Sequence, residues 1–289
     1  MEQAAFFGIV FGLVAMAAYG LSSFLTPVAV RKYGLVRPIF YRECFAAIFM
    51  LAFILATSQW APITADVLLL TLAISLLGFF PVITLFKALS IGKLGINVPI
   101  ANSSVLYTVL LSAIFYREAI SLQQAIAIAL VVVGVVFISF RPGQLKAANL
   151  RHTAAGATYA FATSLIWGLV FFLWKIPVNI IGPVMTAFIL ESGMVLWSAG
   201  WLRFQVGMRI RRKDLLFLAG FGLLVALGTM SYNIGISLAG VSVVAPLTFS
   251  YALLVAVLAR LFNNERLTRL QYLSMVFIVC GIILLTAGQ

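Results

Sequence analysis

The chain repeats one stretch, which reads PIANSSVLYTVLLSAIFYREAISLQQAIAIALVVVG at residues 99–134 and PLTFSYALLVAVLARLFNNERLTRLQYLSMVFIVCG at residues 246–281. In each copy an apolar segment begins near a proline and ends at a glutamate, and a second apolar segment follows. The second segment opens with a hydroxyl residue and has a glutamine three positions later, the pattern of a helix capping box. The repeated positions are Pro99, Ser103, Glu118, Ser121, Gln124 and Gly134, matched by Pro246, Ser250, Glu265, Thr268, Gln271 and Gly281. This duplication predicts two structurally similar halves.

The composition is that of a membrane protein. Of the 289 residues, 64% are hydrophobic and 9% are charged, and the mean hydropathy is +1.16. A soluble domain has about a quarter charged residues, whereas a helix of roughly 20 apolar residues crosses a bilayer core. Charge-free runs of that length or more lie at residues 3–30, 67–86, 94–116, 119–140, 153–174 and 215–259. We therefore predict an all-α membrane protein.

Ten transmembrane helices account for these runs and for the apolar segments between them. We place them at about 4–26, 38–57, 67–86, 96–116, 122–140, 153–175, 182–201, 214–234, 242–262 and 268–286. Five fall in a first repeat at 4–140 and five in a second at 153–288, joined by a hydrophilic linker at 141–152. Because five crossings are an odd number, the second repeat has the opposite orientation, so we predict two inverted five-helix repeats.

The net charge of +12 fits membrane topology better than nucleic-acid binding. With ten spans, all of the 19 Lys and Arg residues except Arg117 and Lys175 fall on the same side. Basic loops face the cytoplasm, so both termini are expected outside it, in a bacterial-type inner membrane. The expected partners are a small-molecule substrate and membrane lipid. Cys44 and Cys280 lie in apolar spans and indicate no disulfide or metal site. There is no P-loop, so we expect no cofactor and no direct use of ATP.

Glu191 is the strongest candidate for a functional residue. It lies about ten residues into the helix at 182–201, near the middle of the bilayer. A charged carboxylate there costs roughly 2.5–3.5 kcal/mol, so it should be protonated, paired or in contact with water. One interpretation is a proton site or an anchor for a substrate amine. The other is a structural hydrogen bond to a neighbouring helix.

Three further glutamates stand beside an arginine near the ends of predicted helices. Glu118 and Glu265 each end a helix, and Glu43 follows Arg42 one turn inside the helix at 38–57. The simpler interpretation is a set of structural ion pairs at the membrane edge. The functional interpretation is a set of gates that break and reform during alternating access.

Polar and aromatic side chains within the spans are candidates for lining a substrate path. Their rings could contact apolar or cationic parts of a substrate, although aromatic residues also serve as interfacial anchors and in helix packing. Pro99 and Pro246 are expected to bend their helices and to free backbone carbonyls. The candidate lining residues are Tyr19, Trp167, Trp174, Asn102, Ser103, Tyr232, Asn233 and Tyr251.

The repeated pattern resembles a known family. Its carriers are residues 86–89 (Phe-Lys-Ala-Leu), Pro99, Glu118, 121–124 and Gly134, with Pro246, Glu265, Leu267, Thr268, Gln271 and Gly281 in the second half. They resemble the ten-helix transporters of the drug/metabolite transporter superfamily, which have two EamA-type repeats, and Arg42 resembles the arginine of that family's second helix. The resemblance implies a pseudo-symmetric bundle around a central cavity and, often, export of amino acids or other small metabolites.

We therefore expect a secondary transporter that exports small organic metabolites such as amino acids by alternating access, with proton coupling at Glu191. A flippase for lipids or other amphiphiles and a non-transporting membrane scaffold are the alternatives. An enzyme is not expected, because the sequence offers one clear mid-membrane carboxylate and catalysis needs several reactive groups at one depth. Since the duplication supplies the pairing that a shorter homologue would obtain by dimerising, we expect a monomer.

Overall fold

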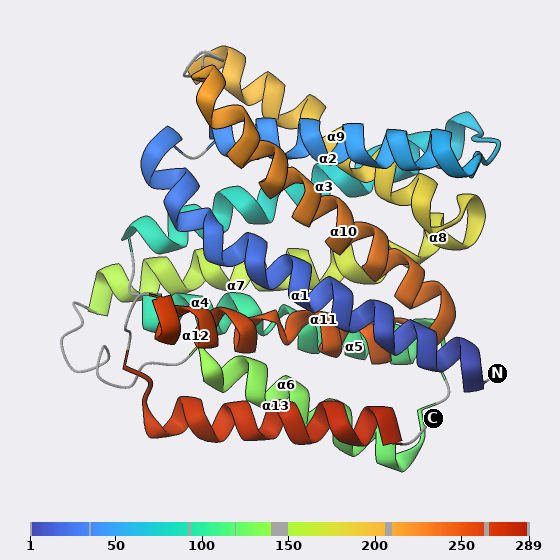
Figure 1. Cartoon of the computed structure of the whole chain (residues 1–289). Coiled ribbons are helices and arrows are strands. Elements are labelled where there is room, and N and C mark those ends of the chain that lie inside the picture. The colour runs from blue at the N-terminus through green and yellow to red at the C-terminus, as the bar shows by residue number, and fades with distance from the viewer. Residues whose placement is uncertain are drawn as a thin grey trace.

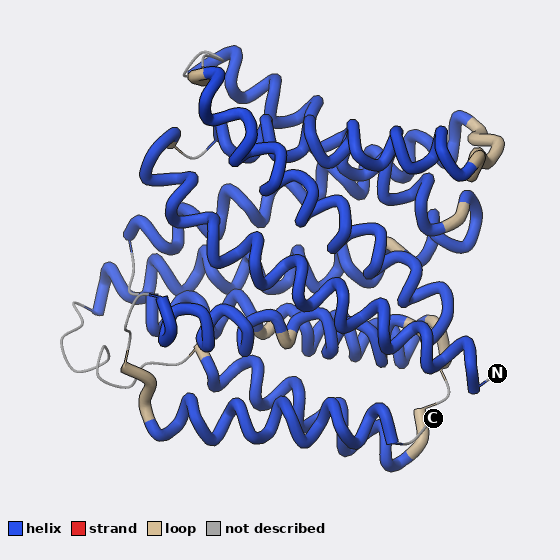
Figure 2. Tube along the Cα trace, viewed as in Figure 1, coloured by secondary structure: helices blue, strands red, loops and turns tan. Residues whose placement is uncertain are grey.

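The computed structural model describes residues 2–34, 36–91, 94–118, 120–139, 150–205, 210–262 and 266–287. Within these ranges every element of regular structure is a helix (Figures 1 and 2). The first repeat contains α1 (Glu2–Tyr33), α2 (Val36–Thr57), α3 (Ala65–Ile91), α4 (Leu94–Asn102), α5 (Ser104–Phe115) and α6 (Leu122–Ile138). The second contains α7 (Leu150–Leu173), α8 (Lys175–Ile181), α9 (Pro183–Gln205), α10 (Leu215–Ala239), α11 (Val241–Phe249), α12 (Tyr251–Phe262) and α13 (Arg269–Ala287), and a 3₁₀ turn, η2 (Arg212–Asp214), precedes α10.

The described helices provide enough membrane-crossing segments for the predicted fold. Eight are long and apolar enough to span a bilayer, and two shorter apolar helices, Ile100–Phe115 and Leu122–Ile138, bring the segments to the predicted ten. The prediction of an all-helical membrane protein made of two repeats is confirmed. In the second repeat α7 already begins at Leu150, and residues 141–149 of the predicted linker lie outside the described residues.

The fourth predicted helix of each repeat is interrupted at a serine. Ser103 separates α4 from α5, and Ser250 separates α11 from α12, so both breaks lie four residues after the repeated proline. The Ser103 hydroxyl donates to the Ile100 carbonyl at 2.7 Å, and the Ser250 hydroxyl donates to the Pro246 carbonyl at 2.8 Å. Such side-chain bonds to the preceding turn compete with the helical ladder and bend helices. The side chain of Pro99 lies outside the described residues.

The two repeats interlock. α1 lies along α10, and its counterpart in the second repeat, α7, lies along α3. α2 packs on α10, and α9 packs on α3, in the same reciprocal way. Two further pairs join equivalent helices: α2 with α9, and α6 with α13, the last seen along the bottom of Figure 1. α5, which follows the first serine break, packs on α11, which precedes the second. Each repeat therefore buries much of its apolar surface against the other.

The repeated glycine and capping box both belong to the α6–α13 pair. A Cβ atom on Gly134 would lie 2.6 Å from a side-chain carbon of Ile278, and one on Gly281 would lie 2.6 Å from Val131. Small residues allow such close helix contacts in membranes. Ser121 with Gln124 forms the predicted capping box of α6, and Thr268 with Gln271 makes the same pair of bonds before α13.

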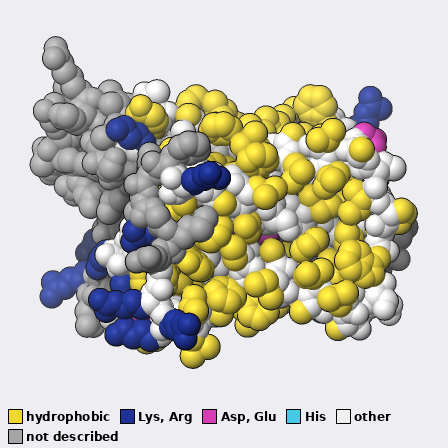
Figure 3. Space-filling model, turned by 90° about the horizontal axis from the view of Figure 1, so that it is seen from above, with side chains coloured by type: hydrophobic (Ala, Val, Ile, Leu, Met, Phe, Trp, Pro, Cys, Tyr) yellow, Lys and Arg dark blue, Asp and Glu magenta, His cyan; other side chains and the backbone are white. Residues whose placement is uncertain are grey.

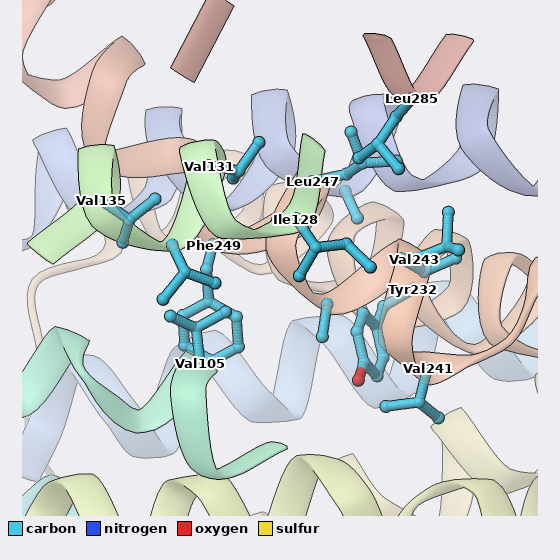
Figure 4. Close-up of a cluster of buried hydrophobic side chains, with 14 of the residues drawn as sticks. Val105, Ile128, Val131, Val135, Tyr232, Val241, Val243, Leu247, Phe249 and Leu285 are labelled. Atoms are coloured by element: carbon cyan, nitrogen blue, oxygen red, sulfur yellow. The ribbon is translucent and has the colours of Figure 1, made fainter. Parts of the chain in front are cut away.

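The largest buried apolar cluster holds the repeats together near α6 and α11. Figure 4 shows Val105 from α5, Ile128 and Val131 from α6, and Leu247 and Phe249 from α11 packed side by side. Their burial joins helices of both repeats.

The outer surface has an apolar face and one basic end. Figure 3 shows hydrophobic side chains over most of the visible described face and most of the visible Lys and Arg side chains gathered at the left. Both chain termini lie at the opposite end, on the right of Figure 1. The exposed basic residues include Arg31, Lys32, Arg211, Arg212 and Lys213, beside the starts of α2 and α10. The charge asymmetry therefore runs along the helix axes.

Candidate functional site

Glu191 lies in a buried hydrogen-bond chain formed by three helices. Glu191 lies on α9 and is only 6% exposed. The Thr229 hydroxyl on α10 donates to Glu191 Oε1 at 2.5 Å, and the Tyr19 hydroxyl on α1 lies 2.9 Å from Thr229 Oγ1. The Thr229 hydroxyl has one hydrogen and donates it to Glu191. The Tyr19 hydroxyl is therefore the donor in its hydrogen bond to Thr229. α9 begins eight residues before Glu191, which places the carboxyl about 12 Å along the helix.

Arg42 and Glu43 form an ion pair within α2. Arg42 donates to Glu43 Oε1 through Nε at 3.0 Å and also through Nη2. The guanidinium lies over the ring of Phe221 on α10, 5.2 Å from its centroid. Glu43 is 1% exposed, and its second oxygen, Oε2, has no hydrogen-bond partner among the described residues. The pair is thus buried, with one carboxylate oxygen left over.

The two buried glutamates meet where α2 packs on α9. Ala46 of α2 and Ala187 of α9 belong to one buried apolar cluster. Glu43 precedes Ala46 by one turn and Glu191 follows Ala187 by one turn, and electrostatic interactions connect Glu191 with both Glu43 and Arg42. Tyr19, Arg42, Glu43, Glu191 and Thr229 together form what we call the carboxyl cluster. The sequence predicted Arg42 and Glu43 at the membrane edge and Glu191 alone at mid-bilayer, whereas the structure brings all three together.

Glu118 lies in a second polar site, which we call the Glu118 cap. Lys175 Nζ donates to Glu118 Oε1 at 2.5 Å. The backbone N–H groups of Val241 and Ser242 donate to Oε1 at 2.9 Å and to Oε2 at 2.8 Å. These are the first residues of α11, so a carboxylate of the first repeat caps a helix N-terminus of the second, where negative charge is favoured. Glu265, its counterpart in the repeat, lies outside the described residues.

The surroundings of Glu118 favour its ionised form. Burial alone raises the pKa of a carboxyl group. Here the hydrogen bonds from Lys175 and from the backbone of Val241 and Ser242 outweigh burial, so the pKa of Glu118 lies below its usual value. Lys175 also lies 4.9 Å from the centroid of the Tyr116 ring. The cap is therefore a charged and well-satisfied contact between the repeats.

Trp174 and Tyr232 lie together in an aromatic group. Their ring centroids are 5.5 Å apart, and Phe171 lies 4.8 Å from Trp174 and 5.2 Å from Tyr232. Tyr232 donates to the Phe171 carbonyl at 3.3 Å, and Asn233 Nδ2 donates to the Pro183 carbonyl at 3.2 Å. Trp174 Nε1 and Asn233 Oδ1 are buried without a partner in the described part of the chain.

The other predicted lining residues lie around the serine break of α4 and α5. Asn102 Nδ2 donates to the Ser139 hydroxyl at 2.8 Å, and Tyr251, on α12, donates to Asn102 Oδ1 at a long 3.5 Å. The hydroxyls of Ser103 and Ser164 are 2.9 Å apart. Trp167, which corresponds to Tyr19, is half-buried on α7. The candidate residues thus fall into separate groups.

Three residues that matter at these sites were not among the predicted site residues. Thr229 links Tyr19 to Glu191, Lys175 neutralises Glu118, and Phe171 joins the aromatic group. Thr229 stands one turn before the candidate residue Tyr232, so helical spacing could have pointed to it. Lys175 was visible as one of the two basic residues on the side opposite the rest.

A family model described as the EamA-like transporter family matches residues 6–140 and 154–287. The chain belongs to the EamA-like transporter family. This EamA-like protein is accordingly a multi-pass integral membrane protein of a family of small-molecule transporters, as the resemblance in the sequence predicted.

Two further comparisons concern the length and the fold of this EamA-like protein. An uncharacterised protein of Methanocaldococcus jannaschii is 31% identical over 133 residues, a match that covers 45% of this chain and 95% of the relative, and so corresponds to about one repeat. A solved crystal structure superposes with a TM-score of 0.79 at 16% sequence identity, over 97% of this chain and 96% of that chain. At that identity the likeness concerns the fold alone.

Proposed function

We propose that this EamA-like protein is a secondary transporter that exports small organic metabolites, such as amino acids, by alternating access, and that proton binding at Glu191 drives the export. The observation that carries the proposal is the buried carboxyl of Glu191, which is held by a neutral hydroxyl and lies against a second carboxyl. Ionisable groups held in this way inside a membrane typically form proton relays and ion pathways.

The interlocked repeats support alternating access. In transporters built from inverted repeats, rocking of one repeat against the other exposes a central site to each side in turn. Here α2 and α9, which carry Glu43 and Glu191, are equivalent helices of the two repeats and pack on each other. A change of charge at these residues would therefore act on a contact between the repeats.

The aromatic group supports a small amphipathic substrate. Trp174 Nε1 can donate a hydrogen bond and Asn233 Oδ1 can accept one, and both are buried without a described partner beside aromatic rings. A molecule with polar ends and an apolar body, such as an amino acid, would complement such groups. The basic end of the molecule would face the cytoplasm, with both termini outside a bacterial-type inner membrane and one chain as the working unit.

The test is uptake into proteoliposomes from a labelled mixture of amino acids, with and without a proton gradient. We expect gradient-driven accumulation that is lost in Glu191→Gln. Asp66→Asn is the matched control, because it also removes one carboxylate but from an exposed position at the start of α3. Exchange of amino acids that is unchanged by the proton gradient would show that proton binding does not drive transport. Lipid scrambling without amino-acid flux would replace the proposed transporter with a flippase.

A further inference from the structure

Glu43 has a buried oxygen that the described side chains do not satisfy. Arg42 donates to Oε1 only, and Oε2 has no partner although the residue is 1% exposed. A buried carboxylate oxygen without a hydrogen bond is costly. On the facing helix α9, the carboxyl of Glu191 interacts with the carboxyl of Glu43. A carboxylate has no hydrogen to donate, so only a proton on one of the two groups can satisfy this oxygen.

The charges of the carboxyl cluster require the same proton. Two ionised carboxyls beside the single guanidinium of Arg42 would leave one uncompensated negative charge inside the membrane. Among the described residues, Tyr19 from α1 and Cys44 from α2 also interact with the pair. A phenol and a thiol are both neutral at neutral pH by their ordinary pKa values. Thr229 on α10 and Ser75 on α3, which donates to the Leu190 carbonyl, are hydroxyls that do not titrate. α8 also packs on α9, and its Lys175 is paired with Glu118.

We propose that Glu43 and Glu191 form one proton-binding site, in which the two carboxyl groups share a single proton and Arg42 balances the remaining negative charge. The site deepens the proposed function, because it assigns the coupling proton to a pair of residues from both repeats. With the proton bound, the cluster is neutral and α2 is joined to α9 by a hydrogen bond. Without it, two carboxylates face each other in a medium of low dielectric constant, and their repulsion favours separation of the two helices.

The repeat explains why the two residues meet. With the shift of 147 residues that aligns Pro99 with Pro246, Glu43 corresponds to Leu190 and Glu191 corresponds to Cys44. The two glutamates are therefore one position apart in the frame of the repeat. Equivalent helices that cross on a two-fold axis bring equivalent positions together, and α2 and α9 are such a pair.

The test is infrared spectroscopy of the purified protein in lipid, titrated with pH in H₂O and in D₂O. Only seven Asp and Glu residues are present, so a band from a protonated carboxyl group can be assigned. We expect one such band at neutral pH, lost on alkaline titration in a single step. Its absence from the unaltered protein at neutral pH would overturn the proposal without any variant.

Two variants then separate a shared proton from a proton held by Glu191 alone. In Glu191→Gln the new amide can donate to Glu43, and in Glu43→Gln the charge of Arg42 becomes available to Glu191, so we expect the band to disappear in both. Asp66→Asn should retain it. A band that persists in Glu43→Gln with an unchanged pH midpoint would overturn the proposal. Elution as a single species in size-exclusion chromatography confirms that the variants are folded.

The spectroscopic result is independent of transport. A shared proton in a protein that moves no amino acid would refute the proposed function and leave the site intact. Proton-driven uptake combined with an unaffected band in Glu43→Gln would do the opposite.

Discussion

The carboxyl groups of Glu118 and Glu191 are both buried between the repeats, yet their partners differ in kind. Glu118 accepts hydrogen bonds from an ammonium group and two backbone N–H groups, so both of its oxygens are satisfied while it is charged. Glu191 accepts from one hydroxyl and faces another carboxyl. The first arrangement favours the ionised form of the carboxyl. The second leaves the charge state to depend on a proton, which is what a coupling site needs.

Glu118→Ala removes the carboxylate of the Glu118 cap and should have the largest effect on stability. It leaves Lys175 as an unpaired, largely buried charge and two N–H groups of α11 without an acceptor. Removing one partner of a buried ion pair costs roughly 3–5 kcal/mol. Fluorescence-monitored unfolding in mixed micelles measures the loss. Asp66→Ala, at an exposed position, is the control, and an equally small change for both would contradict the structural role.

The same contact predicts an acid limit to stability. Since the pKa of Glu118 is lower in the folded protein than its unfolded value of about 4.3, its stabilisation is complete above that pH. It is lost as the pH falls through the lower folded pKa. Unfolding measured between neutral and acidic pH should therefore show a steeper loss of stability in the unaltered protein than in Glu118→Gln. Parallel pH profiles would show that other groups control the acid limit.

Gly240→Ala tests how closely the backbone before α11 approaches Glu118. Gly240 and Gly182 have nearly the same backbone angles, with φ of +81° and +80°, which strain any other residue by about 1–3 kcal/mol. At Gly240 alone an added Cβ would lie 2.9 Å from Glu118 Cδ, whereas at Gly182 it meets nothing within 4 Å. Gly240→Ala should thus be the more destabilising in micelle unfolding. The excess should vanish when Glu118 is also replaced by alanine.

Thr229→Val tests the hydrogen bond to Glu191 and should have a smaller effect on stability. It removes the only hydroxyl donor to Glu191 Oε1 that the described residues provide, and it leaves the Tyr19 hydroxyl without its acceptor. An unsatisfied buried polar group costs roughly 1–3 kcal/mol. Thr229→Ser keeps the hydroxyl and should remain close to the unaltered protein in the same unfolding measurement. Equal losses for valine and serine would mean that packing, not the hydrogen bond, decides.

Tyr19→Phe should have the smallest effect. It removes the far end of the chain and leaves the bond between Thr229 and Glu191 intact. Side-chain hydrogen bonds in membrane proteins are worth about 0.6 kcal/mol on average. A loss of several kcal/mol in the free energy of unfolding would show that Tyr19 supports Glu191 more directly than the geometry indicates.

Local sequence patterns predicted the features that depend on neighbouring residues. Apolar runs gave the helices, the repeat gave the two halves, and both capping boxes formed as predicted, because each needs only a few adjacent residues. The Arg42–Glu43 pair was likewise predictable from adjacency, although its depth was not. The serine breaks at Ser103 and Ser250 were not predicted, since a proline is the stronger general signal for a bend and the hydroxyl bonds appear only in three dimensions.

Contacts between the repeats were harder to predict. Lys175 and Glu118 lie 57 positions apart, and the N-terminus of α11 is more than 120 positions from Glu118, so no pattern along the chain joins them. The meeting of Glu43 and Glu191 was accessible in principle. The repeat alignment places them one position apart, but only the packing of α2 on α9 turns that register into a contact.

The adjacency of Arg42 and Glu43 has a consequence for biogenesis. Because the two are neighbours in one helix, they can leave the ribosome and enter the bilayer already paired, and α2 then carries no net charge from them. Glu191 arrives about 150 residues later, with no cation beside it on its own helix. It must partition into lipid in its neutral form, or wait at the insertion machinery until α2 and the later α10 surround it. In the first case, the order of synthesis delivers Glu191 to the membrane in the protonated form that the proposed proton-binding site requires.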